Sequence, residues 1–138
     1  MDKNVYKEFI KAIELKDVFL SKITSKRSIL ETNNSDINVD VEFKPDFNKL
    51  EQKENEFTSV AQFHVTAKNE NEVLFEIECE FTVINYIDNK ELMQSECIDT
   101  YVQNNLPIIT WPYGREIINS MTTRMGFPAL ILGNHKVV

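Results

Sequence analysis

Apolar and polar residues alternate through much of this sequence, and the pattern limits the folds open to it. The run 37–43 alternates without a fault over seven residues, and two longer runs, 57–67 and 73–87, repeat the period. Successive side chains of a strand point to opposite faces of a sheet, so the period predicts strands with one buried and one solvated face. The apolar face of the first strand is predicted to consist of Ile37, Val39, Val41 and Phe43.

The order of these segments predicts an antiparallel topology. The five polar residues 68–72 are short enough to join 57–67 and 73–87 as a hairpin. Residues 9–25 combine helical spacing early with a cluster of branched apolar residues later, and we predict a long strand there. A short helix or coil is expected over 2–8.

Prolines mark the other boundaries. Pro45 cannot donate to a sheet ladder, so the mostly polar residues 46–56 are predicted to form a long loop. Helical spacing starts at Glu91, is interrupted at Pro107, and resumes at Pro112, which predicts two helical runs. Strands followed by helices indicate an α+β fold. We expect one domain with a four-stranded antiparallel sheet and helices packed on one face.

Charge and composition narrow the functional classes. The 138 residues carry a net charge of −7, and the segments 1–30, 31–99 and 100–138 carry +3, −12 and +2. An acidic protein repels phosphate backbones, so nucleic acid is not expected as a partner. The sequence contains only three glycines, which are too few for a glycine-rich phosphate-binding loop. Cys79 and Cys97 lie far apart without a partner motif, which indicates neither a disulfide scaffold nor a zinc site.

No cofactor, metal or membrane anchor is expected. His64 and His135 have no third ligand at a useful spacing. No window approaches the roughly 20 apolar residues of a membrane helix, and the charged start does not resemble a signal peptide. We therefore expect a cytoplasmic protein without membrane insertion.

The last third of the chain contains a recognisable motif. The segment Trp111-Pro112-Tyr113-Gly114-Arg115-Glu116 is followed by Arg124 and then by Phe127-Pro128-Ala129-Leu130-Ile131-Leu132. It resembles the SecB family of export chaperones, whose signature is an aromatic residue before Pro-Tyr-Ala-Arg-Glu, an arginine nine residues beyond the first, and Phe-Pro-x-Leu-x-Leu at this spacing. The order of four strands, a long loop and a helix entering at Glu91 extends the resemblance upstream.

The sequence departs from the family pattern in three places. Gly114 replaces an alanine, and Met125 replaces a glycine. The printed sequence ends at Val138, where family members continue into a second long helix and an acidic tail. That tail helps the family engage the SecA motor, and shorter members serve other clients, notably antitoxins. SecA and an antitoxin therefore both stay open as partners.

The resemblance implies an ATP-independent holdase, which binds non-native polypeptide segments without catalysis. Exposed aromatic rings bind such segments through their large apolar contact area, without recognising a particular sequence. The negative charge of an acidic surface keeps the chaperone molecules from associating with one another. The resemblance also implies dimers and a dimer of dimers. The residues expected to bind polypeptide are Phe43, Phe47, Tyr86, Leu106, Ile108, Trp111 and Tyr113, and those expected at an oligomer interface are Phe75, Ile77 and Cys79.

Other interpretations of the same residues stay open at this point. Several of the aromatic residues, and the three interface residues, are equally suited to the core of a small domain. Glu76, Glu78 and Glu80 share one strand face, which favours a solvated surface over a pair of catalytic carboxylates. A small-ligand-binding or enzymatic cup between sheet and helix, lined by Trp111, Tyr86 and the glutamate strand, is the alternative of a different class.

Overall fold

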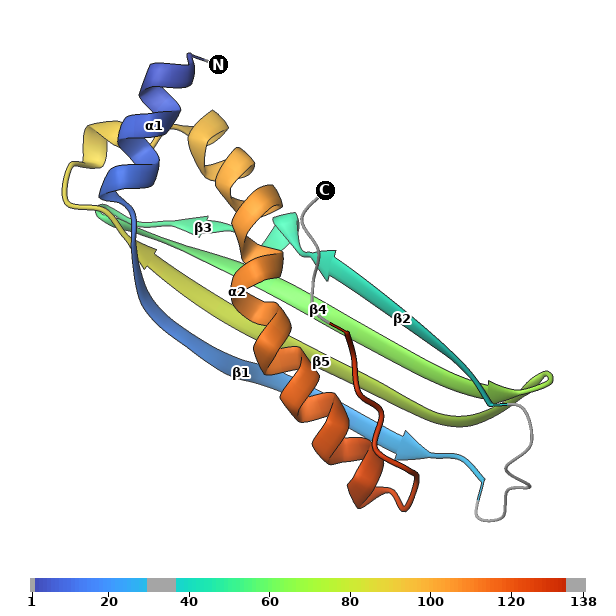
Figure 1. Ribbon diagram of the computed structural model, residues 1–138. Coiled ribbons are helices and arrows are strands. Elements are labelled where there is room, and N and C mark those ends of the chain that lie inside the picture. The colour runs from blue at the N-terminus through green and yellow to red at the C-terminus, as the bar shows by residue number, and fades with distance from the viewer. Residues whose placement is uncertain (1, 30–36, 134–138) are drawn as a thin grey trace.

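The computed structural model describes residues 2–29 and 37–133, apart from the side chain of Asn48. The predictions made for His135 and for the end of the chain fall outside these residues. Figure 1 shows the elements in chain order. They are α1 (Lys3–Ala12), β1 (Glu14–Arg27), β2 (Ile37–Pro45), the 3-10 helix η1 (Phe47–Lys49), β3 (Glu51–Gln52), β4 (Glu56–Asn69), β5 (Glu72–Tyr86), the 3-10 helix η2 (Lys90–Leu92) and α2 (Ser95–Arg124).

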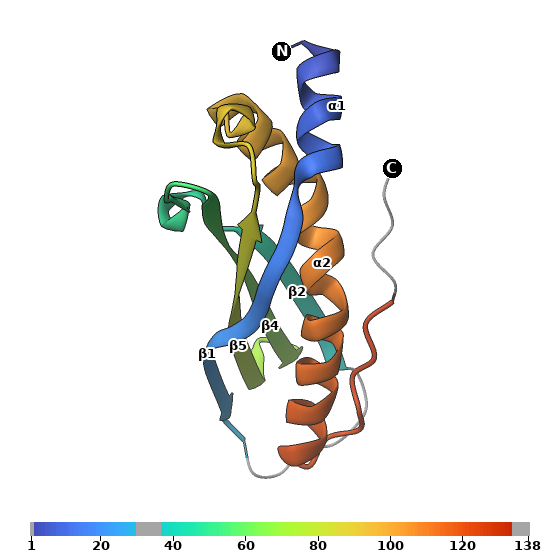
Figure 2. The same cartoon turned by 90° about the vertical axis from the view of Figure 1, so that its left-hand side faces the viewer.

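The sheet is antiparallel with the order β1-β5-β4-β2, and the short β3 pairs with the start of β4. The long helix α2 runs across one face of this sheet, and α1 packs near the start of α2 (Figures 1 and 2). The predicted α+β architecture of four main antiparallel strands with helices on one face is therefore confirmed. Among the described residues, no helix combines the length and the apolar character needed to cross a bilayer.

Register confirms the alternation predicted for the central strands. Phe43 of β2 lies opposite Phe63 of β4, and Phe63 lies opposite Cys79 of β5. All three side chains belong to the face that α2 covers. The hairpin between β4 and β5 turns at Glu70, whose positive φ of 57° is the left-handed conformation that tight turns require.

The N-terminal prediction needs correction. Helix α1 extends to Ala12, so Phe9 and Ile10 are helical and the strand begins at Glu14. Asp2 caps the helix by accepting a hydrogen bond from the backbone N–H of Asn4 at 2.9 Å. Irregularities in the register of β1, after Leu15 and after Leu20, shift its side chains between faces and explain why its sequence does not alternate.

The C-terminal helical prediction is also wrong in one respect, because α2 is a single helix of 30 residues that contains both Pro107 and Pro112. Each proline removes one intrahelical hydrogen bond at a cost of about 3 kcal/mol in an isolated helix. The helix nevertheless continues, since every fourth residue faces the sheet and is buried. These residues are Leu106, Thr110, Gly114, Ile118 and Thr122.

Arg27 connects the end of β1 to the end of α2. Its Nη1 donates to the carbonyl oxygen of Met125 at 2.6 Å, and its Nε donates to that of Ile29 at 2.7 Å. The guanidinium also lies 4.6 Å from the ring centroid of Phe127. These contacts satisfy a carbonyl at the helix terminus and fix the point from which residues 127–133 turn back along α2 (Figure 2).

Candidate functional site

A cluster of aromatic rings lies between α2 and the strands β2, β4 and β5. Phe63 is at its centre, with ring centroids 5.0 Å from Phe43, 5.5 Å from Trp111 and 6.0 Å from Phe81. Phe81 in turn lies 6.0 Å from Tyr113. Phe63 and Phe81 are buried, Phe43 and Trp111 are half-buried, and Tyr113 is exposed. The cluster thus extends from the core to the solvent on both flanks of α2.

The sequence positions these rings through strand register and one glycine. Phe43 and Phe63 are cross-strand partners, which places their rings on the same face of the sheet. Gly114 faces Phe63, and a β-carbon there would lie 2.4 to 2.8 Å from three atoms of its ring. The missing side chain therefore lets α2 approach the sheet closely enough for Trp111 to reach Phe43.

Residues 127–133 form one border of the cluster. The Trp111 Nε1 donates to the carbonyl oxygen of Gly133 at 2.6 Å, and the backbone N–H of Leu130 donates to Thr122 Oγ1 at 3.0 Å. Leu132 is buried against the same cluster. This segment therefore shields part of Trp111, which explains why the indole is only half exposed.

Of the seven residues predicted to bind polypeptide, Phe43, Trp111 and Tyr113 are brought together in the aromatic cluster. Ile108 is 45% exposed and lies one helical turn from Trp111, on the same flank of α2. Tyr113 itself is 47% exposed. Phe43, Trp111 and Ile108 therefore share one flank of α2, whereas Tyr113 reaches solvent on the other flank, beside Phe81.

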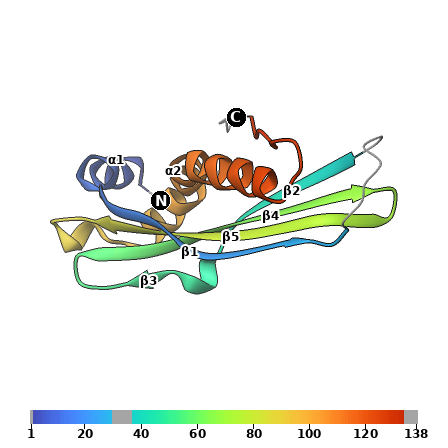
Figure 3. The same ribbon diagram turned by 90° about the horizontal axis from the view of Figure 1, so that it is seen from below.

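The structure does not bring the remaining predicted residues to this surface. Leu106 is only 1% exposed and belongs to the core under α2, so we remove it from the site. Phe47 is 44% exposed but sits on η1, which Figure 3 shows on the side of the sheet away from α2. Tyr86 is half-buried at the end of β5, where its hydroxyl donates to Asp88 Oδ1 at 2.8 Å.

The residues predicted at an oligomer interface also need correction. Phe75, Ile77 and Cys79 are buried beneath α2 within the single chain, so they have no surface to offer a second copy. The sequence pattern did not predict the apolar side chains that are exposed to solvent. Strand β1 exposes several large apolar residues at the edge of the sheet, and the signal that could have found them is the apolar cluster in the N-terminal part of the sequence. They are Leu15, Phe19, Leu20 and Ile23.

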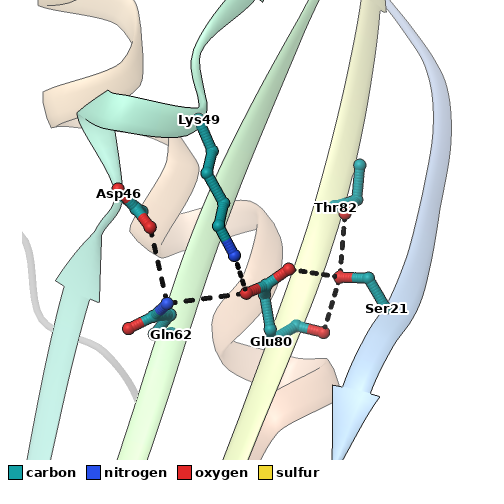
Figure 4. Close-up of polar contacts among 6 residues, drawn as sticks. All are labelled: Ser21, Asp46, Lys49, Gln62, Glu80 and Thr82. Atoms are coloured by element: carbon teal, nitrogen blue, oxygen red, sulfur yellow. Dashed lines mark hydrogen bonds and ion pairs between the residues drawn. The ribbon is translucent and has the colours of Figure 1, made fainter.

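A polar cluster surrounds Glu80 on the open face of the sheet (Figure 4). The Lys49 Nζ of η1 lies 2.7 Å from Glu80 Oε2, and the Ser21 hydroxyl lies 3.1 Å from Glu80 Oε1. Gln62 Nε2 lies 3.5 Å from both Glu80 Oε2 and Asp46 Oδ2. The hydrogen bond from Lys49 holds the pKa of Glu80 below its ordinary value of 4.5, although burial acts in the opposite direction.

Comparison with known families identifies the chain. Residues 3–135 match the model of the SecB family, described as preprotein translocase subunit SecB. The chain belongs to the SecB family. The curated protein-export proteins SecB of Burkholderia lata and Burkholderia cenocepacia are 33% identical to it over 123 residues, which cover 89% of this chain and 72% and 71% of theirs.

A solved SecB-like structure shares the fold. It is the Mycobacterium tuberculosis SecB-like chaperone Rv1957, in complex with a ChAD peptide from the antitoxin HigA1. Its TM-score to this chain is 0.86 over 99% of both chains, at 16% sequence identity. The two-layer arrangement of sheet and long helix is therefore common to both SecB-like proteins.

The geometry of this SecB-family chain does not form the cup that was the alternative prediction. Trp111 lies on the side of the sheet covered by α2, whereas Glu76 and Glu78 are exposed on the opposite face. Glu80 is buried rather than solvated, which corrects the prediction for the third glutamate. Within residues 2–29 and 37–133, no three His, Cys, Asp or Glu side chains gather closely enough to hold a metal ion.

Both cysteine thiols of this SecB-family protein are expected to be unreactive in the native state. Burial raises the pKa of Cys79 to about 12, and burial also raises the pKa of Cys97. Because the thiolate is the reactive species, Ellman's reagent at pH 8 should label neither cysteine before unfolding and both in guanidinium chloride. Rapid labelling of Cys79 in the folded protein would contradict its position beneath α2.

Proposed function

We propose that this protein is an ATP-independent holdase chaperone that binds non-native polypeptide segments on the aromatic surface beside α2. The observation that carries the proposal is the cluster of Phe43, Trp111 and Tyr113, whose rings continue from the core into solvent. A rigid aromatic surface of this kind provides contact area for varied apolar segments. Membership of the SecB family supports the same activity.

Binding to this surface needs no bond to be made or broken, so we propose no catalytic step and no cofactor. The net charge of −7 opposes association of chaperone particles through their exposed apolar side chains. As a member of the SecB family, the protein is proposed to act in the cytoplasm. The names of the Burkholderia relatives support protein export as the process served.

A narrower candidate is a chaperone dedicated to one partner, such as an antitoxin. The peptide bound by the Mycobacterium tuberculosis SecB-like chaperone supports it, because that peptide comes from an antitoxin. The two candidates differ in selectivity rather than in the surface used. A general holdase is expected to protect unrelated denatured proteins, whereas a dedicated one should protect its own partner alone.

The test of the proposed function is suppression of aggregation without ATP. Chemically denatured citrate synthase is diluted into buffer with the purified protein, and light scattering is followed. Wild type is expected to suppress scattering at molar excess. Trp111→Ala and Tyr113→Ala should weaken the affinity for client by about tenfold, the loss typical of a buried aromatic contact at an interface.

Two features make this test decisive. Tyr113 is exposed, so its truncation removes surface without opening the core. Ile10→Ala on α1 is the matched control, since it removes an exposed apolar side chain distant from the aromatic cluster. Unchanged scattering in the presence of wild type, with citrate synthase and with other denatured proteins, would rule out the general holdase.

We propose that a second copy of the chain covers the exposed apolar side chains of β1. This strand is at the edge of the sheet, with free backbone groups on one side, and Leu20 and Ile23 are exposed along it. Leu20→Glu and Ile23→Glu should convert a dimer into a monomer, as measured by sedimentation equilibrium at micromolar concentration. A wild-type mass of 16.1 kDa at that concentration would contradict the proposal.

A further inference from the structure

Glu80 is the one charged residue that is buried in the part of the chain described by the structure, at 8% exposure. A buried carboxylate is unfavourable unless it is paired and hydrogen-bonded. Here its partners come from separate parts of the chain: Lys49 from η1, Gln62 from β4 and Ser21 from an irregularity in β1. Thr82 completes the arrangement by donating to Ser21 Oγ at 2.8 Å (Figure 4).

The segment that this carboxylate holds is the excursion between β2 and β4. The backbone N–H of Asp46 fixes its start by donating to the carbonyl oxygen of Val60 at 2.7 Å. Its end is fixed by β3, where Glu51 pairs with Thr58. Between these points the segment leaves the plane of the sheet (Figure 3). Lys49 reaches back from η1 to Glu80 across the open face (Figure 4).

Phe47 lies in the same turn of η1 as Lys49. Its side chain is 44% exposed, and η1 lies on the side of the sheet opposite α2 (Figure 3). The Lys49 side chain is 49% exposed, and an ion pair that water reaches adds little net stability, so stability alone does not favour this pair. A direct charged hydrogen bond does tie η1 to the open face of the sheet.

We infer that Glu80 is a positioning residue for polypeptide binding: through Lys49 it holds η1 on the sheet and presents Phe47 as a second contact for the client. This inference rests on the proposed function. The aromatic surface beside α2 and the helix η1, which carries Phe47, lie on opposite sides of the sheet near its β2 margin. A client segment long enough to pass over this margin contacts both.

The inference predicts the behaviour of four variants. Glu80→Gln and Lys49→Met each remove the charged hydrogen bond, so amide hydrogen exchange in residues 46–52 should rise about tenfold, the effect of losing one such bond. Affinity for reduced, carboxymethylated α-lactalbumin should fall by about the same factor. Lys49→Arg keeps the cation and should retain both properties. Glu78→Gln, an exposed acid two residues away on the same strand face, is the matched control and should change neither.

The double variant separates a positioning role from a general loss of stability. Because Glu80→Gln and Lys49→Met remove the same interaction, combining them should weaken client binding no further than either change alone. Exchange in β4 and β5, away from the cluster, should stay at the wild-type rate. A purely structural role would instead raise exchange throughout the sheet and leave the affinity of the folded molecules unchanged.

Three results would overturn the inference. These are wild-type exchange over residues 46–52 in Glu80→Gln, faster exchange there with unchanged client affinity, and a uniform rise across the sheet. Failure of the wild type to bind any unfolded client would remove the proposed function and the inference with it. The exchange measurement distinguishes that case, since it detects the Lys49–Glu80 pair without a client.

Discussion

Truncation of Phe9 to alanine is expected to lower the free energy of unfolding by about 3–5 kcal/mol, the range found for large aromatic residues in protein cores. The Phe9 side chain is fully buried, and it is the residue through which α1 enters the core. Its ring centroid lies 5.9 Å from that of Tyr101 and 6.3 Å from that of Phe57. Removal of the ring therefore opens a cavity and loosens the contact between α1, α2 and β4.

Urea denaturation followed by circular dichroism measures this loss. Ile10→Ala serves as the control, because Ile10 neighbours Phe9 on the same helix but is 39% exposed. We expect the control to lower the free energy of unfolding by about 0.5 kcal/mol or less, as surface substitutions usually do. Equal effects of the two changes would contradict the packing of α1 described here.

The strands with an alternating sequence were predictable because one face of each packs toward α2 and the other faces solvent. For β2, β4 and β5 the sequence pattern predicts the strand, and the observed ends lie within about two residues of those expected. It also predicts the buried face of β4 and β5, whereas on β2 the prediction is wrong for Val39, which is 39% exposed at the edge of the sheet. Strand β1 lacks this regularity, since two irregularities move its side chains from one face to the other. The sequence pattern predicts that Phe9 belongs to that strand, whereas the structure places it in α1.

The continuity of α2 could not be predicted from local preference. Pro107 and Pro112 each disfavour a helix interior, so local preference predicts two helical runs instead of one helix. Packing against the sheet outweighs this cost, because the buried stripe of α2 passes through both prolines without a break. The same continuity explains Leu106: in an unbroken helix it shares a face with Thr110 and is buried, while Ile108 points away and is exposed.

The candidate site was partly predictable, for a related reason. The motif around Pro112 indicates which aromatic residues lie at one place in the sequence, and strand register then brings Phe43 to Trp111. The sequence of residues 46–52 has no periodic pattern from which their course across the open face could be predicted. The approach of Lys49 to Glu80, and the burial of that carboxylate, depend on this path and became visible only in three dimensions.

Gly114 is the position at which helix preference and packing oppose each other. Alanine is favoured over glycine in a helix interior by about 1 kcal/mol. At this position, however, an added β-carbon would lie 2.4 to 2.8 Å from ring atoms of Phe63. That ring cannot move aside easily, since Phe43, Phe81 and Trp111 surround it. Overpacking of this kind typically costs about 1–3 kcal/mol.

Gly114→Ala is therefore expected to destabilise the protein by about 2 kcal/mol despite its better helix propensity. In a Phe63→Leu background the smaller side chain leaves room for the methyl group, and the same change should become neutral or stabilising by up to about 1 kcal/mol. The coupling between the two positions, measured by a double-mutant cycle in urea, should be about 2 kcal/mol or more. Additive effects would mean that Phe63 is not the reason for glycine at this position. If Gly114→Ala destabilises the wild type but stabilises the Phe63→Leu variant, the Gly114–Phe63 pair sets the distance between α2 and the sheet. The contact of Trp111 with Phe43 depends on that distance.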